Sequence, residues 1–87
     1  LYLQSEGRQI HLITLSRKYT FYKKMDDVHA ELGDGFVRIH QRYLVQCSAV
    51  DSFTGENVTV GKHVLPVSRS NRANAMEAIA KHLLGQV

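Results

Sequence analysis

The sequence predicts a single domain that is mainly β with a minor α component, built from antiparallel strands and two short helices. Short runs of β-branched and aromatic residues recur along the chain, and polar turns separate them. Only two segments, residues 25–33 and 71–84, place apolar residues at helical spacing. At 87 residues, with 44% hydrophobic and 22% charged residues, the chain can form one thin hydrophobic core.

The first third of the chain predicts three consecutive antiparallel strands. Residues 2–4 have the character of a strand end, and residues 9–15 alternate loosely, as the second strand of a hairpin does. Gly7 lies between them, where it can adopt a positive φ. A basic turn then leads to residues 19–22, whose aromatic side chains favour a third strand.

A short amphipathic helix is expected over residues 25–33. Asp26 and Asp27 face away from its apolar side and suit the positive end of the helix dipole. Gly33 lies where a helix ends. The apolar side consists of Met25, Val28 and Leu32.

Residues 36–46 read F-V-R-I-H-Q-R-Y-L-V-Q and predict two strand segments joined by a turn. Side chains alternate between two faces from Phe36 to His40. The polar pair Gln41 and Arg42 then separates two apolar runs, so it predicts a turn that faces solvent and is the first candidate for a functional site. We expect His40 to be a hydrogen-bonded structural residue and not a metal ligand or a base.

The second half predicts three more strands and the second helix. Residues 49–53 and 58–60 form a hairpin around Gly55, and residues 64–67 form a last strand. Pro66 places that strand at a sheet edge, or marks its end, because proline cannot donate to a ladder. Ser70 or Asn71 is expected to cap the terminal helix, and Gly85 to end it. The expected apolar stripe of this helix is Ala75, Met76, Ile79, Ala80 and Leu83.

The formal net charge is +3, which permits binding to a phosphate polyanion without requiring it. The basic residues gather in turns and at the ends of elements. Such residues can simply be solvated, or several turns can meet at one side of the sheet and form a basic surface for a phosphate backbone.

Metal binding and catalysis are poorly supported. The five histidines are scattered without the close ligand pairs of a zinc module, and Cys47 is the only cysteine. The sequence contains no nucleophile elbow, glycine-rich phosphate cradle or paired carboxylates in an apolar setting. We therefore expect no enzymatic activity and no cofactor. The single cysteine and the lack of a long apolar run favour a soluble protein of a reducing compartment.

Two motifs together resemble the LytTR DNA-binding domain. Residues 36–46 are similar to the F-x-R-I-H-R-S-Y-L-V-N signature of that family. Residues 65–69, L-P-V-S-R, are similar to its second element, which stands just before the terminal helix. Residues 2–32 also resemble the opening of the family, so the resemblance covers essentially the whole chain.

The resemblance implies an elongated antiparallel LytTR-type β fold and a single domain over residues 1–87. It further implies one more strand before Leu1 and an upstream receiver domain, neither of which is in this chain. LytTR domains are cytoplasmic output modules of bacterial two-component response regulators and regulate transcription. They bind double-stranded DNA through loops that reach successive major grooves, as a pair on direct-repeat sites.

Carried over residue by residue, the family's base contacts fall at Arg69, at Gln41 with Arg42, and at Arg8 with Gln9. Phosphate contacts are expected from Lys18, Lys62, Asn71 and Arg72. Three positions depart from the signature: Gln41 replaces Arg or Asn, Arg42 replaces Ser, and Gln46 replaces Asn. The DNA sequence that this chain recognises therefore cannot be taken over from that of a relative.

A rival interpretation belongs to another class. The chain can be a small β-rich protein-interaction module whose basic turns only keep it in solution. The two hypotheses differ in their response to salt, because phosphate contacts make affinity fall steeply as salt rises.

Overall fold

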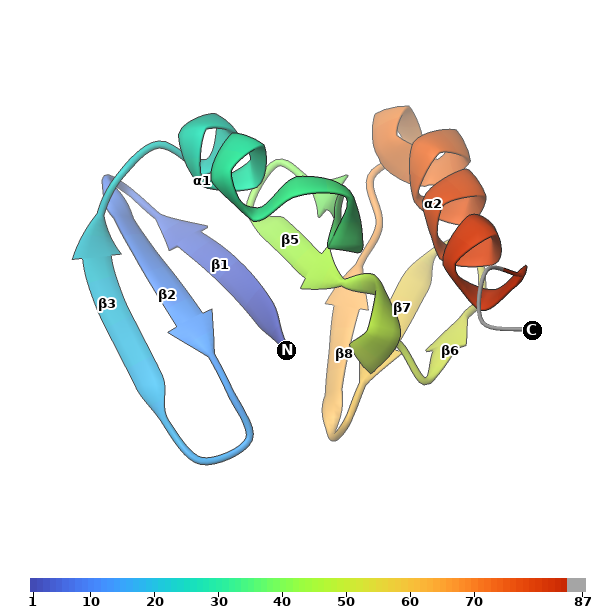
Figure 1. Cartoon of the computed structure of the whole chain (residues 1–87), viewed down its shortest axis with the longest axis horizontal. Helices are drawn as coiled ribbons and strands as arrows, with labels where there is room; N and C mark the ends of the chain where they lie inside the picture. Colours follow the sequence, from blue (N-terminus) through green and yellow to red (C-terminus); the bar gives the residue numbers. More distant parts are fainter. Residues whose placement is uncertain (85–87) are drawn as a thin grey trace.

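The computed structural model describes residues 1–84 and contains eight strands and two α-helices (Figure 1). The strands are β1 (Tyr2–Glu6), β2 (Gln9–Ile13), β3 (Lys18–Tyr22), β4 (Phe36–His40), β5 (Tyr43–Gln46), β6 (Ser52–Phe53), β7 (Asn57–Val60) and β8 (His63–Pro66). The helices are α1 (Met25–Leu32) and α2 (Arg72–Leu84). Three short 3-10 turns complete the chain: η1 (Gly33–Gly35), η2 (Cys47–Ala49) and η3 (Arg69–Asn71).

The strands form two antiparallel sheets, one in the order β3-β2-β1-β5-β4 and one in the order β6-β7-β8. The three-strand meander predicted for the first third is confirmed, and β5 then pairs with the free side of β1. Tyr2 therefore lies opposite Ile13 on one side and Val45 on the other. The molecule measures 35 × 29 × 23 Å and has a radius of gyration of 12.2 Å, so it is compact and not elongated as the resemblance implied.

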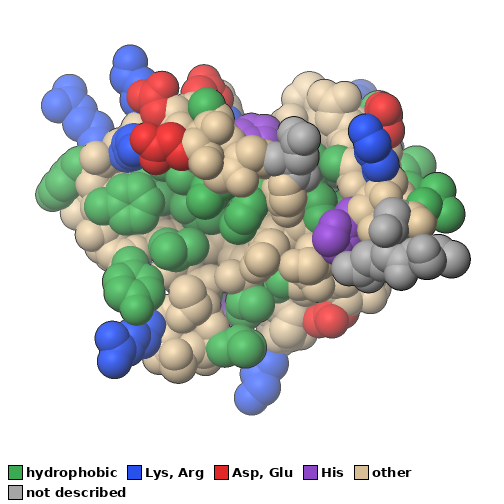
Figure 2. All heavy atoms as spheres, in the orientation of Figure 1, with side chains coloured by type: hydrophobic (Ala, Val, Ile, Leu, Met, Phe, Trp, Pro, Cys, Tyr) green, Lys and Arg blue, Asp and Glu red, His purple; other side chains and the backbone are tan. Residues whose placement is uncertain are grey.

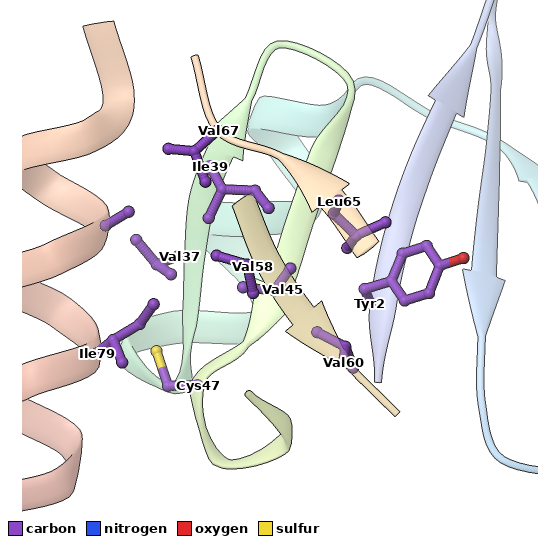
Figure 3. Packing of buried hydrophobic residues seen from close by; sticks show 11 residues of the cluster. Tyr2, Val37, Ile39, Val45, Cys47, Val58, Val60, Leu65, Val67 and Ile79 are labelled. Carbon is purple, nitrogen blue, oxygen red and sulfur yellow. The ribbon is translucent and has the colours of Figure 1, made fainter. Parts of the chain in front are cut away.

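Hydrophobic side chains cover both faces of the larger sheet. The larger core lies among this sheet, the three-stranded sheet and α2 (Figure 3). On the opposite face, Leu3, Ile10 and Leu44 pack against Met25 and Val28 of α1. The larger core contains Tyr2, Val37, Ile39, Val45, Cys47, Val58, Val60, Leu65, Val67, Ala75 and Ile79.

Several local predictions are confirmed. Side chains of β4 alternate between buried and half-buried from Phe36 to His40. Gly7 and Gly55 adopt φ values of 61° and 94°, which only glycine adopts without strain. Pro66 ends β8, and β8 is an edge strand.

The strand predicted over residues 49–53 is wrong in its first half. Residues 47–49 form η2, in which the Val50 amide donates to the Cys47 carbonyl oxygen at 3.3 Å, and β6 holds only Ser52 and Phe53. The strand predicted over residues 9–15 ends at Ile13, because the next residues enter the turn to β3.

The apolar stripe of the terminal helix is also predicted only in part. Ala75 and Ile79 are buried, whereas the Met76 side chain is 53% exposed, Leu83 is 60% exposed and Ala80 is exposed. Only a narrow side of α2 packs against the core, so Met76, Ala80 and Leu83 face solvent. The predicted stop at Gly85 lies outside the described residues. None of the helices within residues 1–84 has the length and hydropathy needed to cross a membrane.

Candidate nucleic-acid interface

Three turns meet along one edge of the molecule, which we call the turn edge: residues 7–8, residues 41–42, and the segment from Ser68 into η3 (Figure 1). Two backbone hydrogen bonds fix this arrangement. The Ser5 amide donates to the Arg42 carbonyl oxygen at 2.8 Å, so the β4–β5 turn lies beside the end of β1. The Ser68 amide donates to the Ile39 carbonyl oxygen at 2.8 Å, so η3 begins beside the end of β4.

The β4–β5 turn is held from within by Arg38. Its guanidinium donates to the carbonyl oxygens of His40 at 3.0 Å and Gln41 at 2.7 Å. The same group donates to the Asp26 carboxylate at 2.7 Å, which ties the turn to the start of α1. Asp26 therefore has a partner in β4 that the helix-dipole argument did not predict.

His40 supports the same turn. Its Nδ1 accepts the amide hydrogen of Arg42 at 3.1 Å, and its ring packs edge-on against Tyr43 with centroids 5.7 Å apart. The structural role predicted for this histidine is confirmed. With the backbone fixed in this way, the side chains of Gln41 and Arg42 are exposed and make no hydrogen bond or ion pair with residues 1–84.

The η3 segment presents Arg69 in a similar way. The Arg69 side chain is exposed and has no partner among the described residues. Ser68 organises the backbone around it: its carbonyl oxygen accepts the Asn71 amide at 3.1 Å, and its hydroxyl accepts from the Asn71 side chain at 2.7 Å. The Asn71 side chain thus bonds back to Ser68, and η3 leads directly into α2 at Arg72.

The other residues predicted for the site differ in accessibility. Arg8 is exposed in the β1–β2 turn. Gln9 is half-buried, and its amide donates to the Tyr22 hydroxyl at 3.2 Å. Arg72 is half-buried, and its Nε has no hydrogen-bond partner among residues 1–84. Of these three, Arg8 is the one whose side chain is fully free to contact a partner molecule.

Lys18 and Lys62 are exposed but are not brought to the turn edge. Lys18 begins β3 and pairs with Ile13, at the end of β2 remote from Arg8. Lys62 lies in the β7–β8 turn, and β8 runs from there toward Ser68. Figure 2 accordingly shows basic side chains projecting from both ends of the sheets.

Two lysines of the basic turns that were not among the predicted DNA contacts lie near the turn edge. Lys23 and Lys24 connect β3 to α1, next to the β1–β2 turn, and both are exposed. Lys23 pairs with Glu31 at 2.5 Å, whereas Lys24 has no partner among the described residues. Their position could have been inferred, because β3 of a meander ends where β2 begins.

The remaining polar groups do not assemble into another kind of site. Within residues 1–84, no three His, Cys, Asp or Glu side chains lie in an arrangement that could hold a metal ion. The Cys47 side chain is buried, and burial raises the pKa of its thiol above the ordinary value of 9.0. A thiol that resists ionisation in this way is a poor nucleophile.

Comparison with known proteins matches residues 1–80 to the LytTr DNA-binding domain. Among solved structures, the chain is similar to a LytTr DNA-binding domain of a methyl-accepting/DNA response regulator from Bacillus cereus. The TM-score is 0.78 at 16% sequence identity, covering 90% of this chain and 78% of that one. A search of curated protein sequences finds no match. Because the family match spans nearly the whole described chain, and the mainly antiparallel fold agrees with it, the chain belongs to the LytTr DNA-binding domain family.

Proposed function

We propose that this domain binds double-stranded DNA in a sequence-specific manner, as the cytoplasmic output domain of a bacterial transcriptional response regulator. The observation that carries the proposal is the turn edge. Its three turns each present an exposed side chain that can contact a base and has no partner within residues 1–84: Arg8, Gln41 with Arg42, and Arg69.

The chemistry of these side chains suits the edges of bases in the major groove. An arginine can donate two parallel hydrogen bonds to guanine, and a glutamine can bond adenine through both its amide groups. Arg69 and Gln41 would read bases, and Arg8 and Arg42 would contact either bases or phosphates. The turns take the role that a recognition helix has in other folds, because both helices pack on the sheet.

The phosphate contacts follow from position. Asn71 and Arg72 lie beside Arg69 and would contact the backbone next to it, although both are half-buried. Gln9, which bonds Tyr22, would support the β1–β2 turn more than it would contact DNA. Lys18 and Lys62 lie at the opposite end of the strands, so one duplex along the turn edge would not reach them. This placement argues against the phosphate role that the sequence suggested for both.

Binding as a pair on direct repeats is part of the same proposal. A single domain presents one narrow edge, so two copies side by side on one face of the duplex would lengthen the recognised sequence. Gln41 and Arg42 depart from the family signature. We therefore expect the base preference of this chain to differ from that of its relatives.

The test begins with selection of bound duplexes from a random pool. Titrations of the selected duplex at several salt concentrations should give a log–log slope of about −0.9 for each phosphate contact. Arg69→Ala should weaken the selected site by about 1–3 kcal/mol and relax the preference at one position. Lys62→Gln, a matched loss of one charge, should leave selectivity unchanged. Recovery of no enriched sequence at low salt would refute the proposal and favour a protein-interaction module.

A further inference from the structure

A groove with a volume of about 770 Å³ opens beside the turn edge, on the α1 side of the larger sheet. It runs between the β1–β2 turn, the segment that connects β3 to α1, and the first turn of α1. In Figure 2, basic and acidic side chains stand at the upper left, above hydrophobic side chains on the face of the sheet. The volume lies within the range of small-molecule binding sites.

The floor of this groove is apolar. Ile10 and Met25 lie at its base, but they are only 1% and 6% exposed, so little of their own surface is open to a ligand. The ring of Tyr22, which is 75% exposed, forms one wall. A ligand body of aromatic or aliphatic carbon can therefore displace water mainly from the exposed Tyr22 ring, which is favourable by about 25 cal/mol for each Å² of apolar area buried.

The rim carries two cations that nothing in residues 1–84 neutralises. Arg8 and Lys24 are exposed and have no ion-pair or hydrogen-bond partner among the described residues. The other charges at the groove are paired: Arg38 with Asp26 at 2.7 Å, and Lys23 with Glu31 outside the groove at 2.5 Å. The groove thus combines an apolar floor with an uncompensated positive rim.

We propose that this groove binds a small amphipathic anion, with a carboxylate or sulfonate held by Arg8 and Lys24 and an apolar body against Ile10, Met25 and Tyr22. The DNA backbone is a poorer occupant. Its phosphates carry no apolar body to cover the floor, and a rigid duplex lies across projecting side chains without entering a hollow. Binding of the anion itself does not depend on the proposed DNA-binding function.

One consequence does rest on that function. Arg8 belongs both to the rim of the groove and to the turn edge, so it cannot satisfy a bound anion and DNA at the same time. A molecule in the groove would lower the affinity for DNA, and DNA would lower the affinity for that molecule by the same factor.

The direct test uses anilinonaphthalene sulfonate as the probe, titrated into the intact chain and followed by calorimetry and by probe fluorescence. Lys24→Glu should weaken binding by about tenfold or more, because one charge-assisted contact is lost and a repulsion is added. Lys62→Glu carries the same charge change at the opposite end of the molecule and should alter the affinity by less than about twofold in physiological salt. Circular dichroism and unfolding curves establish that both variants are folded.

Two further probes separate the roles of charge and apolar body. Methanesulfonate, which lacks the apolar body, and N-phenylnaphthylamine, which lacks the anion, should each bind at least about tenfold more weakly than the parent probe. Equal affinity for either fragment would overturn the proposal, as would equal effects of the Lys24 and Lys62 substitutions.

The link to DNA is tested separately, with a duplex selected from the random pool. Saturating probe should reduce the affinity of the unmodified chain for that duplex and have little effect on the Lys24→Glu chain. If the chain binds no duplex, the proposed function fails, but the probe titrations still test whether the groove binds an amphipathic anion. If probe and duplex bind without affecting each other, the shared use of Arg8 is refuted.

Discussion

The guanidinium of Arg38 donates a hydrogen bond to the carbonyl oxygen of Gln41 at 2.7 Å, so a half-buried side chain of β4 fixes the backbone of an exposed turn on the proposed interface. Its second backbone contact, to His40 at 3.0 Å, and its ion pair with Asp26 hold the guanidinium in place. The side chain that would contact DNA at this turn and the side chain that positions it are therefore different residues.

Replacing Arg38 with Gln should weaken DNA binding and lower stability together. Hydrogen bonds to charged groups contribute about 1.5–3 kcal/mol each, although the partial exposure of this site reduces that value. We expect a loss of about 1–2 kcal/mol in the free energy of unfolding, and selectivity lost mainly at the base next to Gln41. Urea unfolding and binding titrations measure the two effects.

Asp26→Asn is the matched control for that change. It removes only the ion pair, whose carboxylate side is 91% exposed, and leaves both backbone bonds of Arg38 available. An exposed ion pair contributes about 0.2–1 kcal/mol, so both stability and binding should change little. If Asp26→Asn has the larger effect on DNA binding, the positioning role belongs to the ion pair and not to the bonds with the turn.

Gln41→Ala should remove discrimination at a single base position, by about 1–3 kcal/mol, without changing the salt dependence. The reason is that a neutral amide reads a base edge and releases no counterion. Arg42→Ala at the neighbouring position should reduce the slope of log affinity against log salt by about 0.9 if its guanidinium contacts a phosphate. A uniform loss across all sequences in the Gln41 variant would contradict a base-reading role.

Two apolar residues of α2, one buried and one exposed, give a test of stability with an internal control. Ile79 is 7% exposed and Met76 is 53% exposed on the same helix. Ile79→Ala should cost about 2–4 kcal/mol, because it leaves a cavity in the larger core. Met76→Ala should cost less than about 1 kcal/mol, since alanine favours helix and the side chain is largely in water. Equal losses in chemical unfolding would mean that both residues pack against the protein.

Local patterns were sufficient to predict the turn at Gln41 and the structural role of His40. The alternating strand and the polar pair predict the turn, and the place of His40 inside an apolar stretch predicts its structural role. The structure adds its partner, the amide of Arg42. The pairing of Arg38 with Asp26 was not predictable in this way, because it joins segments 12 residues apart that only the packing of α1 brings together.

The placement of Lys18 shows where the sequence reasoning was incomplete. Successive turns of a meander alternate between the two ends of a sheet, so the β2–β3 turn cannot lie beside the β1–β2 turn that carries Arg8. Lys24, in contrast, follows β3 and returns to the end near Arg8. The strand order was already expected from the sequence, and tracing the turns along it would have separated these two lysines.

The stability of the domain should decline at alkaline pH, and Cys47 should contribute to the decline. Burial raises the pKa of the Cys47 thiol above 9.0 and that of the Tyr2 phenol above 10.0, with the charge of Tyr43 adding to the second shift. At a pH between the pKa of such a group in the unfolded chain and its higher pKa in the folded chain, only the folded chain keeps the proton. The free energy of unfolding therefore falls as pH rises.

Urea unfolding at neutral pH and above pH about 9 should show this loss of stability, beginning near the ordinary thiol pKa. Cys47→Ala should be less stable at neutral pH because it removes a buried side chain. In this variant the fall in the free energy of unfolding near the thiol pKa should be smaller, and the fall at higher pH, from Tyr2, should remain. A pH dependence identical in the two chains would exclude Cys47 as its source.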